Sequence, residues 1–367
     1  MRDIRTETQL KGKRVLVRID IDDALETPFP VRAIVPTISF LREQGARIIL
    51  LAHVGRDGES SALPLSEVLN KEINVRFVPD ITGDVAQDAV VHMHDGEVVF
   101  LENVRRDKRE VANDEGFARE LASLADVYVN EAFAVSHRKH ASIVGVPQFL
   151  PSFSGIQFQK EIEMLSKARM PESPSLFILG GAKFETKLPL ITAFSRLYDS
   201  VFIGGALANN FFKARGFEIG TSTLSGEENN ISDLLVQENI LVPIDVVVAH
   251  EGVRDIKTPD ALQLHERIAD AGPQTLALLK EKIAHSRTIL WNGPLGEYEN
   301  GFGEATDALA RALAESTART TVGGGDTAAS IASLGLEEKF TFLSTGGGAM
   351  LDYLLEGTLP GIEALRS

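Results

Sequence analysis

Short apolar runs alternate with segments of helical period along the first 150 residues. Between the runs, apolar side chains recur every three or four positions, as they do on one face of a helix, in 35–44, 65–70 and 115–124. The runs themselves, which we interpret as strands, are 14–19, 47–52, 75–79, 98–102 and 127–130. Strands that alternate with helices predict an α/β domain whose parallel sheet is covered by helices on both faces.

The pattern changes around residues 147–175 and then starts again. Pro147 and Pro151 precede a long segment of helical period, 155–169, which we interpret as a helix that connects two domains. Further apolar runs follow at 175–179, 200–203, 241–248, 288–291 and 319–322. The sequence therefore predicts two domains, with boundaries at 1–152 for the first, 153–172 for the linker helix, 173–345 for the second and 346–367 for a C-terminal segment.

Composition narrows the class of protein. The chain has 367 residues, no cysteine and a formal net charge of −15, which argues against a surface for nucleic acid and excludes disulfides and thiolate chemistry. No apolar run reaches the roughly 18 residues of a membrane-spanning helix, and the first residues lack the apolar core of a secretion signal. We expect a cytoplasmic protein without nucleic-acid or membrane partners.

Polar and basic side chains follow the predicted strands of the first half. They occur in the segments 20–22, 53–56, 102–106 and 130–140. Because the carboxyl ends of parallel strands meet at one edge of the sheet, these side chains should lie together. The basic ones are Arg18, His53, Arg56, Arg105, His137, Arg138 and His140. Arginine matches the oxygens of carboxylates and phosphates, so the cluster predicts a site for a small anion with several charges.

Two glycine-rich turns follow strands in the second half. Val322–Ala328 reads VGGGDTA and Ser344–Met350 reads STGGGAM. Glycines allow backbone amides to approach an anion closely, and the N-terminus of a following helix adds partial positive charge. We expect Asp326 to be the N-cap of its helix or a magnesium ligand, and Thr327 to offer its hydroxyl and its amide.

The segment Gly180–Lys187, GGAKFETK, places Lys183 and Lys187 four residues apart at the start of a predicted helix. A lysine there opposes the helix dipole, so an anion such as a polyphosphate should lie nearby. The segment lacks the spacing of the Walker A motif, and the chain lacks the HRD and DFG signatures of protein kinases.

Taken in order, these motifs resemble those of the phosphoglycerate kinase family over nearly the whole chain. The matching segments are RVLVRID (14–20), GARIILLAHVGR (45–56), VVFLENVR (98–105), LADVYVNEAF (124–133), SHRKHASIVGVPQFLP (136–151), ILGGAK (178–183), IDVVVA (244–249), WNGPLG (291–296), VGGGDTA (322–328) and STGGGA (344–349). The resemblance implies two Rossmann-like domains that are joined by a hinge helix, face each other across a cleft and close for the reaction. It also implies that the C-terminal segment returns to the first domain, that the chain is a monomer, and that it is a glycolytic kinase.

The resemblance further implies that the first domain binds 3-phosphoglycerate or 1,3-bisphosphoglycerate and the second binds ADP or ATP with Mg²⁺. The implied substrate residues are Arg18, Asp20, Asp22, His53, Arg56, Arg105, His137 and Arg138. The implied nucleotide residues are Lys187, Gly204, Gly205, Asn292, Glu299, Gly324, Gly325, Asp326 and Thr327, with Asp326 directing the metal and Glu299 the ribose. The implied catalytic groups are Lys183 and the amides of Gly325 and Gly348. To these we add Arg32 as the nearby replacement for a family arginine.

Four departures from the family pattern leave alternatives open. Asp22 stands where the family has an amide, and the family's arginine before the next helix aligns with Pro30, in a shortened loop that leaves Arg32 as the nearby replacement. Thr186 replaces an acid, and Gly204–Asn210 lacks a third glycine and an aromatic residue. We predict an active but slowed enzyme. The alternatives are a nucleotide-binding paralogue that has lost transfer, and a kinase for another carboxylate.

Overall fold

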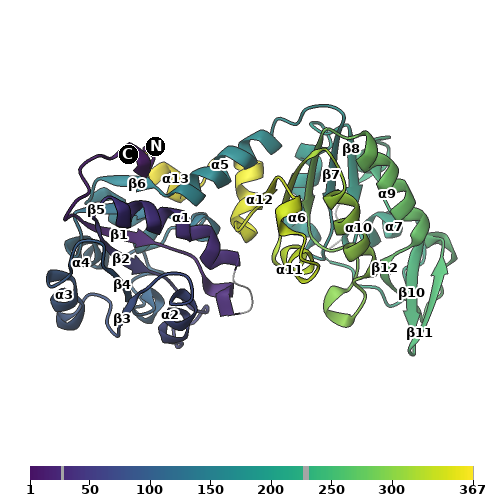
Figure 1. The fold of residues 1–367 in the computed structure, drawn as a ribbon. Coiled ribbons are helices and arrows are strands. Elements are labelled where there is room, and N and C mark those ends of the chain that lie inside the picture. The colour runs from purple at the N-terminus through teal and green to yellow at the C-terminus, as the bar shows by residue number, and fades with distance from the viewer. Residues whose placement is uncertain (26–28, 226–230, 367) are drawn as a thin grey trace. The chain divides into compact units, whose positions relative to one another are not determined.

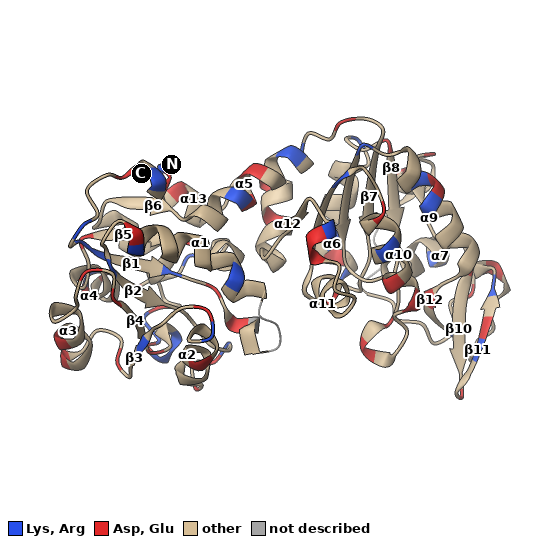
Figure 2. Ribbon diagram, viewed as in Figure 1, with Lys and Arg blue, Asp and Glu red and all other residues tan. Residues whose placement is uncertain are grey.

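The computed structural model describes residues 1–25, 29–225 and 231–366. Residues 26–28, which belong to the shortened loop, lie outside the described residues. The chain divides into two compact units, the first made of Met1–Glu163 and the chain from Glu356 onward, the second of Met164–Leu355. Figure 1 labels the elements of both units, and Figure 2 shows charged residues of both signs on the helices and loops of each.

Unit 1 is built on a six-stranded sheet in the order β3-β4-β2-β1-β5-β6, in which every neighbouring pair is parallel. Its strands are β1 (Arg14–Arg18), β2 (Arg47–Leu51), β3 (Arg76–Val78), β4 (Val98–Leu101), β5 (Val127–Asn130) and β6 (Ser152–Ser154). Its helices are α1 (Phe29–Glu43), α2 (Leu63–Leu69), α3 (Asp84–Val91), α4 (Glu115–Ser123) and α13 (Pro360–Ala364), together with the start of α5 (Ile156–Ala168). The buried runs of the middle strands are those expected of a parallel sheet covered on both faces.

Unit 2 contains a second six-stranded parallel sheet, in the order β15-β14-β13-β7-β8-β9, and a three-stranded antiparallel sheet, β11-β10-β12. The parallel strands are β7 (Ser175–Leu179), β8 (Ser200–Ile203), β9 (Ile240–Leu241), β13 (Thr288–Asn292), β14 (Arg319–Gly323) and β15 (Phe342–Leu343). The others are β10 (Val246–His250), β11 (Val253–Lys257) and β12 (Arg267–Ala271). The helices are α6 (Phe184–Phe194), α7 (Leu207–Ala214), α8 (Ser232–Leu235), α9 (Pro273–His285), α10 (Glu304–Ala314), α11 (Gly325–Ser333) and α12 (Gly347–Glu356).

The predicted fold class, α/β with parallel sheets in two domains, is confirmed, and one predicted strand is wrong. The apolar run 241–248 is two strands in different sheets, because Pro243 and the following residues carry the chain out of β9 and into β10. Proline has no N–H for a sheet ladder, which explains why a single strand does not continue through this run.

The helix that leaves unit 1, α5, begins against a buried carboxylate. Glu131, which follows β5, accepts hydrogen bonds from the amides of Gln157 (3.1 Å) and Phe158 (3.0 Å) and from the hydroxyl of Thr37. Burial raises the pKa of Glu131 to about 7, although these bonds act in the opposite direction. A Cβ on Gly155 would overlap this carboxylate, so the chain enters α5 at a glycine.

The end of the chain packs within unit 1. The amide of Gly361 donates to the carbonyl of Ser136 (2.8 Å), and Leu359 and Ile362 are buried. Among the described residues, no helix combines the length and the apolar character that are needed to cross a bilayer.

Candidate active site

In unit 1, basic side chains collect at the carboxyl ends of four neighbouring strands. Arg18 ends β1, His53 follows β2, Arg105 follows β4 and Arg138 follows β5. The guanidinium of Arg18 donates to Nδ1 of His53 (3.2 Å), and Arg105 donates through Nη1 to the carbonyl of Gly55 (2.5 Å). The predicted meeting of these side chains at one sheet edge therefore occurs.

The cluster is buried and strongly cationic. Arg18, His53 and Arg105 are 0%, 4% and 5% exposed. Burial, followed by the charges of Arg18 and Arg105, holds the pKa of His53 well below its usual range, so this imidazole is neutral and accepts from Arg18 at Nδ1. Burial and the neighbouring Arg18 and Arg138 likewise lower the pKa of Arg105. Because positive charge on these side chains is unfavourable in the unliganded cluster, binding of an anion there should be favourable.

Two carboxylates flank His53. Asp20 Oδ1 lies 3.7 Å from Nδ1 and Asp22 Oδ2 lies 3.7 Å from Nε2. Asp22 also accepts a hydrogen bond from the amide of Gly55 (2.9 Å), which ties the segment after β1 to the one after β2. The side-chain oxygen of an asparagine could accept the same hydrogen bond from Gly55, so Asp22 keeps this one role of the family's amide residue.

A hydrogen-bond chain of two residues, which were not predicted from the sequence, fixes the guanidinium of Arg18. Its Nε donates to the hydroxyl of Ser142 (2.9 Å), which in turn donates to the fully buried Glu110 (2.6 Å). Burial raises the pKa of Glu110, and the charge of Arg18 opposes this rise. A glutamate within a run of charged residues gives no signal of burial, so the sequence alone could not have identified it.

The remaining basic residues differ in their surroundings. Arg138 and His137 are half-buried, with Arg138 Nε 3.2 Å from His137 Nε2, and Arg56 is exposed. His140 is buried, and burial together with Arg105 and Arg18 lowers its pKa to about 4. Arg32 lies on α1 with its side chain 65% exposed, and its Nε contacts Glu72 Oε1 (3.5 Å).

In unit 2, the glycine-rich turns follow three strands of the parallel sheet, of which β14 and β15 are neighbours and β7 is separated from them by β13. Lys183 is the N-cap residue of α6 after β7, Gly324 is the N-cap of α11 after β14, and Gly348 lies in the first turn of α12 after β15. The prediction of Asp326 as N-cap is wrong, because Gly324, with φ of 105°, makes the turn and leaves Asp326 as the second residue of α11. Gly325 and Gly348 have open space where a Cβ would be, so a ligand could approach their backbone closely.

A cavity of about 340 Å³ lies beside these turns. Gly181, Gly205, Asp326 and Glu299 line it, with residues of β12 and residues after β13. The further lining residues are Ala182, Ala206, Asn209, Thr223, Ile268, Ala269, Asp270, Pro294, Leu295, Gly296, Glu297, Tyr298 and Asn300. Asp270 was missed by the sequence analysis because β12 was not predicted; burial raises its pKa to about 7.

Other predicted nucleotide residues lie next to this cavity. The Nζ of Lys187 donates to the carbonyl of Gly180 (2.6 Å), and burial lowers its pKa to about 8 while Asp326 acts to raise it. Asn292 is buried at the end of β13, and the hydroxyl of Thr327 accepts from the amide of Gly293 (3.0 Å). Gly204 packs so closely that an added Cβ would lie 2.7 Å from Leu295.

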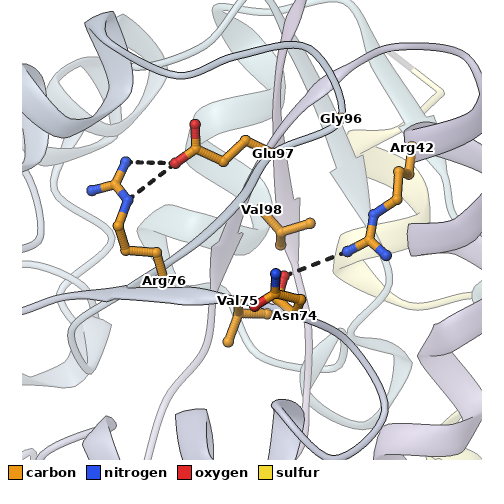
Figure 3. Close-up of a pocket in the computed structure, with 7 residues that line it drawn as sticks. All are labelled: Arg42, Asn74, Val75, Arg76, Gly96, Glu97 and Val98. Atoms are coloured by element: carbon orange, nitrogen blue, oxygen red, sulfur yellow. Dashed lines mark hydrogen bonds and ion pairs between the residues drawn. The ribbon is translucent and has the colours of Figure 1, made fainter.

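A second cavity, of about 360 Å³, lies at the opposite, amino end of the unit 1 sheet. Figure 3 shows that its charged side chains are paired: Arg76 with Glu97 (2.9 Å), and Arg42 with the carbonyl of Asn74 (3.4 Å). Its lining residues are Arg42, Asn74, Val75, Arg76, Gly96, Glu97 and Val98. Because Glu97 neutralises Arg76 and Arg42 already donates to a carbonyl, this cavity is a weaker candidate for an anion site than the strand-end cluster.

Comparison with known proteins decides between the open hypotheses. The family model described as "Phosphoglycerate kinase" matches residues 5–358. The chain belongs to the phosphoglycerate kinase family. It is 41% identical to the phosphoglycerate kinases of Pelotomaculum thermopropionicum, over 98% of both chains, and of Dictyoglomus turgidum, over 99% of this chain and 98% of the other.

Solved structures of the family agree with this assignment. The phosphoglycerate kinase of Pyrococcus horikoshii superposes with a TM-score of 0.88 at 29% identity, covering 100% of this chain and 98% of the other. That of Coxiella burnetii gives 0.83 at 33% identity, covering 99% and 98%. The family's enzymes are phosphotransferases with a carboxyl group as acceptor, and the findings support that activity here rather than a paralogue that has lost transfer.

Gly205 provides a first test of whether the cavity of unit 2 binds a nucleotide. A Cβ there would lie 2.7 Å from Gly181 N and 2.9 Å from Pro294 O, at a φ of +58°. We expect Gly205→Ala to weaken ADP binding at least about tenfold and to lower stability by roughly 2 kcal/mol more than the control. The control is Gly216→Ala, where φ is also positive (+83°) but nothing lies within 4 Å of the added Cβ. Titration calorimetry and thermal unfolding of both variants measure this, and equal effects would show that the close approach is unimportant.

Proposed function

We infer that this chain catalyses the reversible transfer of a phosphoryl group between 1,3-bisphosphoglycerate and ADP, giving 3-phosphoglycerate and ATP. The family assignment supports this reaction. The observation that carries the substrate side is Arg105, whose Nη2 is buried and lacks a hydrogen-bond partner in the described part of the chain. A guanidinium held among other arginines with a free donor needs an anion.

On the substrate side, we assign direct contacts to Arg105, whose Nη2 lacks a partner among the described residues, and to the half-buried or exposed basic residues around it. Arg105, Arg138, His137 and Arg56 would bind the phosphate and carboxylate oxygens. Arg18 is fully enclosed, so it would act by orienting His53. Asp20 and Asp22 would fix His53 and the loop at Gly55, and could accept from a substrate hydroxyl.

On the nucleotide side, the cavity of unit 2 would hold the base and ribose, with Gly204, Gly205 and Glu299 contributing to it. Lys187, Asn292 and the residues Gly324–Thr327 would lie along the phosphates. Among the described residues, no three His, Asp or Glu side chains group around one point, so the protein offers no cage of its own for a metal. Mg²⁺ does not need one, because it commonly binds one or two carboxylates together with substrate phosphates and water. Asp326 is the carboxylate that would hold the ion, whose chemistry is to neutralise charge on the phosphates.

The proposed catalysis is alignment and charge neutralisation without a covalent intermediate. Lys183 would stabilise the phosphoryl group in transfer. The backbone amides of Gly325 and Gly348, at the starts of α11 and α12, would donate to its oxygens. We also propose that the chain works as a monomer in the cytoplasm, and analytical ultracentrifugation would test its oligomeric state.

Lys187 gives the nucleotide site a dependence on pH. Its pKa is about 8, so its positive charge is present below that pH and is lost above it. An adjacent phosphate favours the charged form, and therefore ADP affinity should fall as the pH rises from about 7 to about 9, by up to roughly tenfold. Lys187→Arg keeps its charge over this range and should remove the dependence. Calorimetric Kd values for ADP at pH 7 and pH 9 measure this dependence, with Lys213→Arg as the control. If Lys187→Arg loses as much ADP affinity as the wild type between these pH values, Lys187 does not contact the phosphates.

The activity itself is tested by a coupled assay of ATP-dependent phosphorylation of 3-phosphoglycerate. We expect activity in the wild type and a loss of about tenfold in kcat for Arg32→Ala, because an exposed arginine is less well positioned than a fixed one and contributes less than an arginine finger. Arg42→Ala, also exposed on α1, should be unaffected. No transfer by the wild type, with ADP still bound, would refute the proposed function; equal kcat for wild type and Arg32→Ala would refute only the role of Arg32.

A further inference from the structure

The helix that follows Lys183 begins without a cap from its own N-cap residue. Lys183 is the N-cap of α6, and its side chain makes no capping hydrogen bond. Serine, threonine, aspartate and asparagine are preferred at this position because their oxygens accept from amides of the first turn. An ammonium has only donors and cannot do so. The first turn of α6 therefore needs acceptors from elsewhere in the protein.

Ser225 supplies one of these acceptors from a distant segment. Its hydroxyl accepts a hydrogen bond from the amide of Phe184 (2.6 Å), 41 positions away in the sequence. The same amide lies 3.0 Å from the carbonyl of Ala182, and Lys183 between them has φ of −84° and ψ of 80°, close to the geometry of an inverse γ-turn. Ser225 therefore fixes this turn from outside.

The peptide that joins Lys183 to Phe184 is held at both ends. Its N–H donates to Ser225, and its carbonyl, that of Lys183, accepts from the hydroxyl of Thr186 (3.0 Å). A carboxylate at position 186 could only accept, so this second bond depends on the threonine. The ring of Phe184 is fully buried and packs edge-to-face on Phe211 of α7. These contacts set the direction in which the exposed side chain of Lys183 leaves the backbone.

The backbone of Ser225 is itself fastened to a helix. Nδ2 of Asn210, on α7, donates to the carbonyl of Ser225 (2.9 Å). Nδ2 of the preceding residue, Asn209, donates to the carbonyl of Thr223 (2.8 Å). Two neighbouring asparagines thus hold alternate carbonyls of the segment 223–225. The hydroxyl of Ser225 is presented to α6 from a fixed backbone, which is what precise placement of a catalytic group requires.

We propose that Ser225 is a positioning residue for phosphoryl transfer: by fixing the peptide after Lys183, it directs the ammonium toward the transferring group. This inference rests on the proposed function, in which Lys183 stabilises that group. A misplacement of about 1 Å can cost up to about 100-fold in rate. Binding of ADP should depend on Ser225 much less, because Lys187 has its own anchor at the carbonyl of Gly180.

Variants of Ser225 separate positioning from support of the fold. For Ser225→Ala we expect kcat to fall about tenfold, with the Kd of ADP within about threefold of wild type. Ser225→Thr keeps a hydroxyl and should retain at least about half of the wild-type kcat. The matched control is Ser195→Ala at the other end of α6, where the lost hydroxyl donates to the carbonyl of Thr192 (3.1 Å). It should lower the Tm about as much as Ser225→Ala does and keep full kcat.

A double-mutant cycle with Lys183→Ala tests the route of the effect. If Ser225 acts through Lys183, adding Ser225→Ala to Lys183→Ala should lower kcat by less than about twofold. If Ser225→Ala does not fold, Ser225→Cys takes its place in the same cycle, because a thiol keeps the shape of the side chain but accepts only weakly.

Three outcomes would overturn the inference while leaving the proposed function intact. They are an unchanged kcat in Ser225→Ala, a further tenfold loss in the double variant, and a kcat in Ser225→Thr as low as that of the alanine variant. Wild-type kcat in Lys183→Ala would instead remove Lys183 from the transfer step, and this inference with it.

Discussion

Replacing Lys183 by alanine is expected to lower kcat about 1,000-fold and to change ADP affinity by less than about threefold. Lys183 is the N-cap residue of α6, and its exposed ammonium makes no ion pair with any residue in the described ranges. A cation at a helix N-terminus is unfavourable by itself, because the helix dipole is positive there. Its position is explained if it stabilises charge that develops on a transferring phosphoryl group, which the substrate-free protein lacks.

The stability of the Lys183 variant distinguishes this role from a structural one. Removing a cation from the N-terminus of a helix should leave the free energy of unfolding unchanged or raise it by about 0.3–1 kcal/mol. The Tm should therefore stay the same or rise slightly. Lys213→Ala, in the last turn of α7 where a cation is favoured, is the control and should retain full kcat. Steady-state kinetics and calorimetry measure the effects. A Lys183→Ala enzyme with wild-type kcat would exclude Lys183 from the transfer step.

Replacing Arg105 by methionine should raise the KM for 3-phosphoglycerate roughly 100-fold, because a hydrogen bond to a charged group contributes about 1.5–3 kcal/mol and more than one would be lost. The same change should raise the Tm. The lowered pKa of Arg105 shows that its charge is unfavourable in the unliganded fold, through burial and the neighbouring Arg18 and Arg138. Binding and stability should therefore change in opposite directions.

Arg106→Met is the matched control for this prediction. Arg106 is adjacent in sequence, but its side chain is 49% exposed and pairs with Glu102 (3.3 Å). We expect its KM to remain within about twofold of wild type and its Tm to stay the same or fall slightly, since an exposed ion pair contributes at most about 1 kcal/mol. If Arg105→Met lowers the Tm and leaves KM unchanged, Arg105 is a structural residue.

The sequence predicted most of the parallel sheets, because their middle strands are buried on both faces and are continuous in apolar residues. It missed β6, which has three residues and follows the prolines at 147 and 151. It also missed β11 and β12, and it joined β10 to β9 as a single strand. Strand β11 reads VRDIK and is largely exposed, so no apolar run marks it. Edge strands of this kind are specified by their partners rather than by their own residues.

Some features of the candidate site could be predicted from the sequence and others could not. Glycines and basic residues at strand ends could be predicted, since the topology of a parallel sheet brings such positions to one edge. The pairing of Arg32 with Glu72 could not, because it joins residues 40 positions apart on the surface. Nor could the enclosure of Arg18 by Ser142 and Glu110, which depends on how a π-helical turn at Ala141–Gly145 packs.

The first unit is completed by the chain from Glu356 onward, which follows the whole of the second unit in the sequence. During synthesis, domains generally fold as units, the N-terminal one first. Here the first unit must wait, with the surface that receives Leu359 and Ile362 uncovered, until the entire second unit has been made. The order in which the ribosome delivers the chain therefore couples completion of unit 1 to synthesis of unit 2.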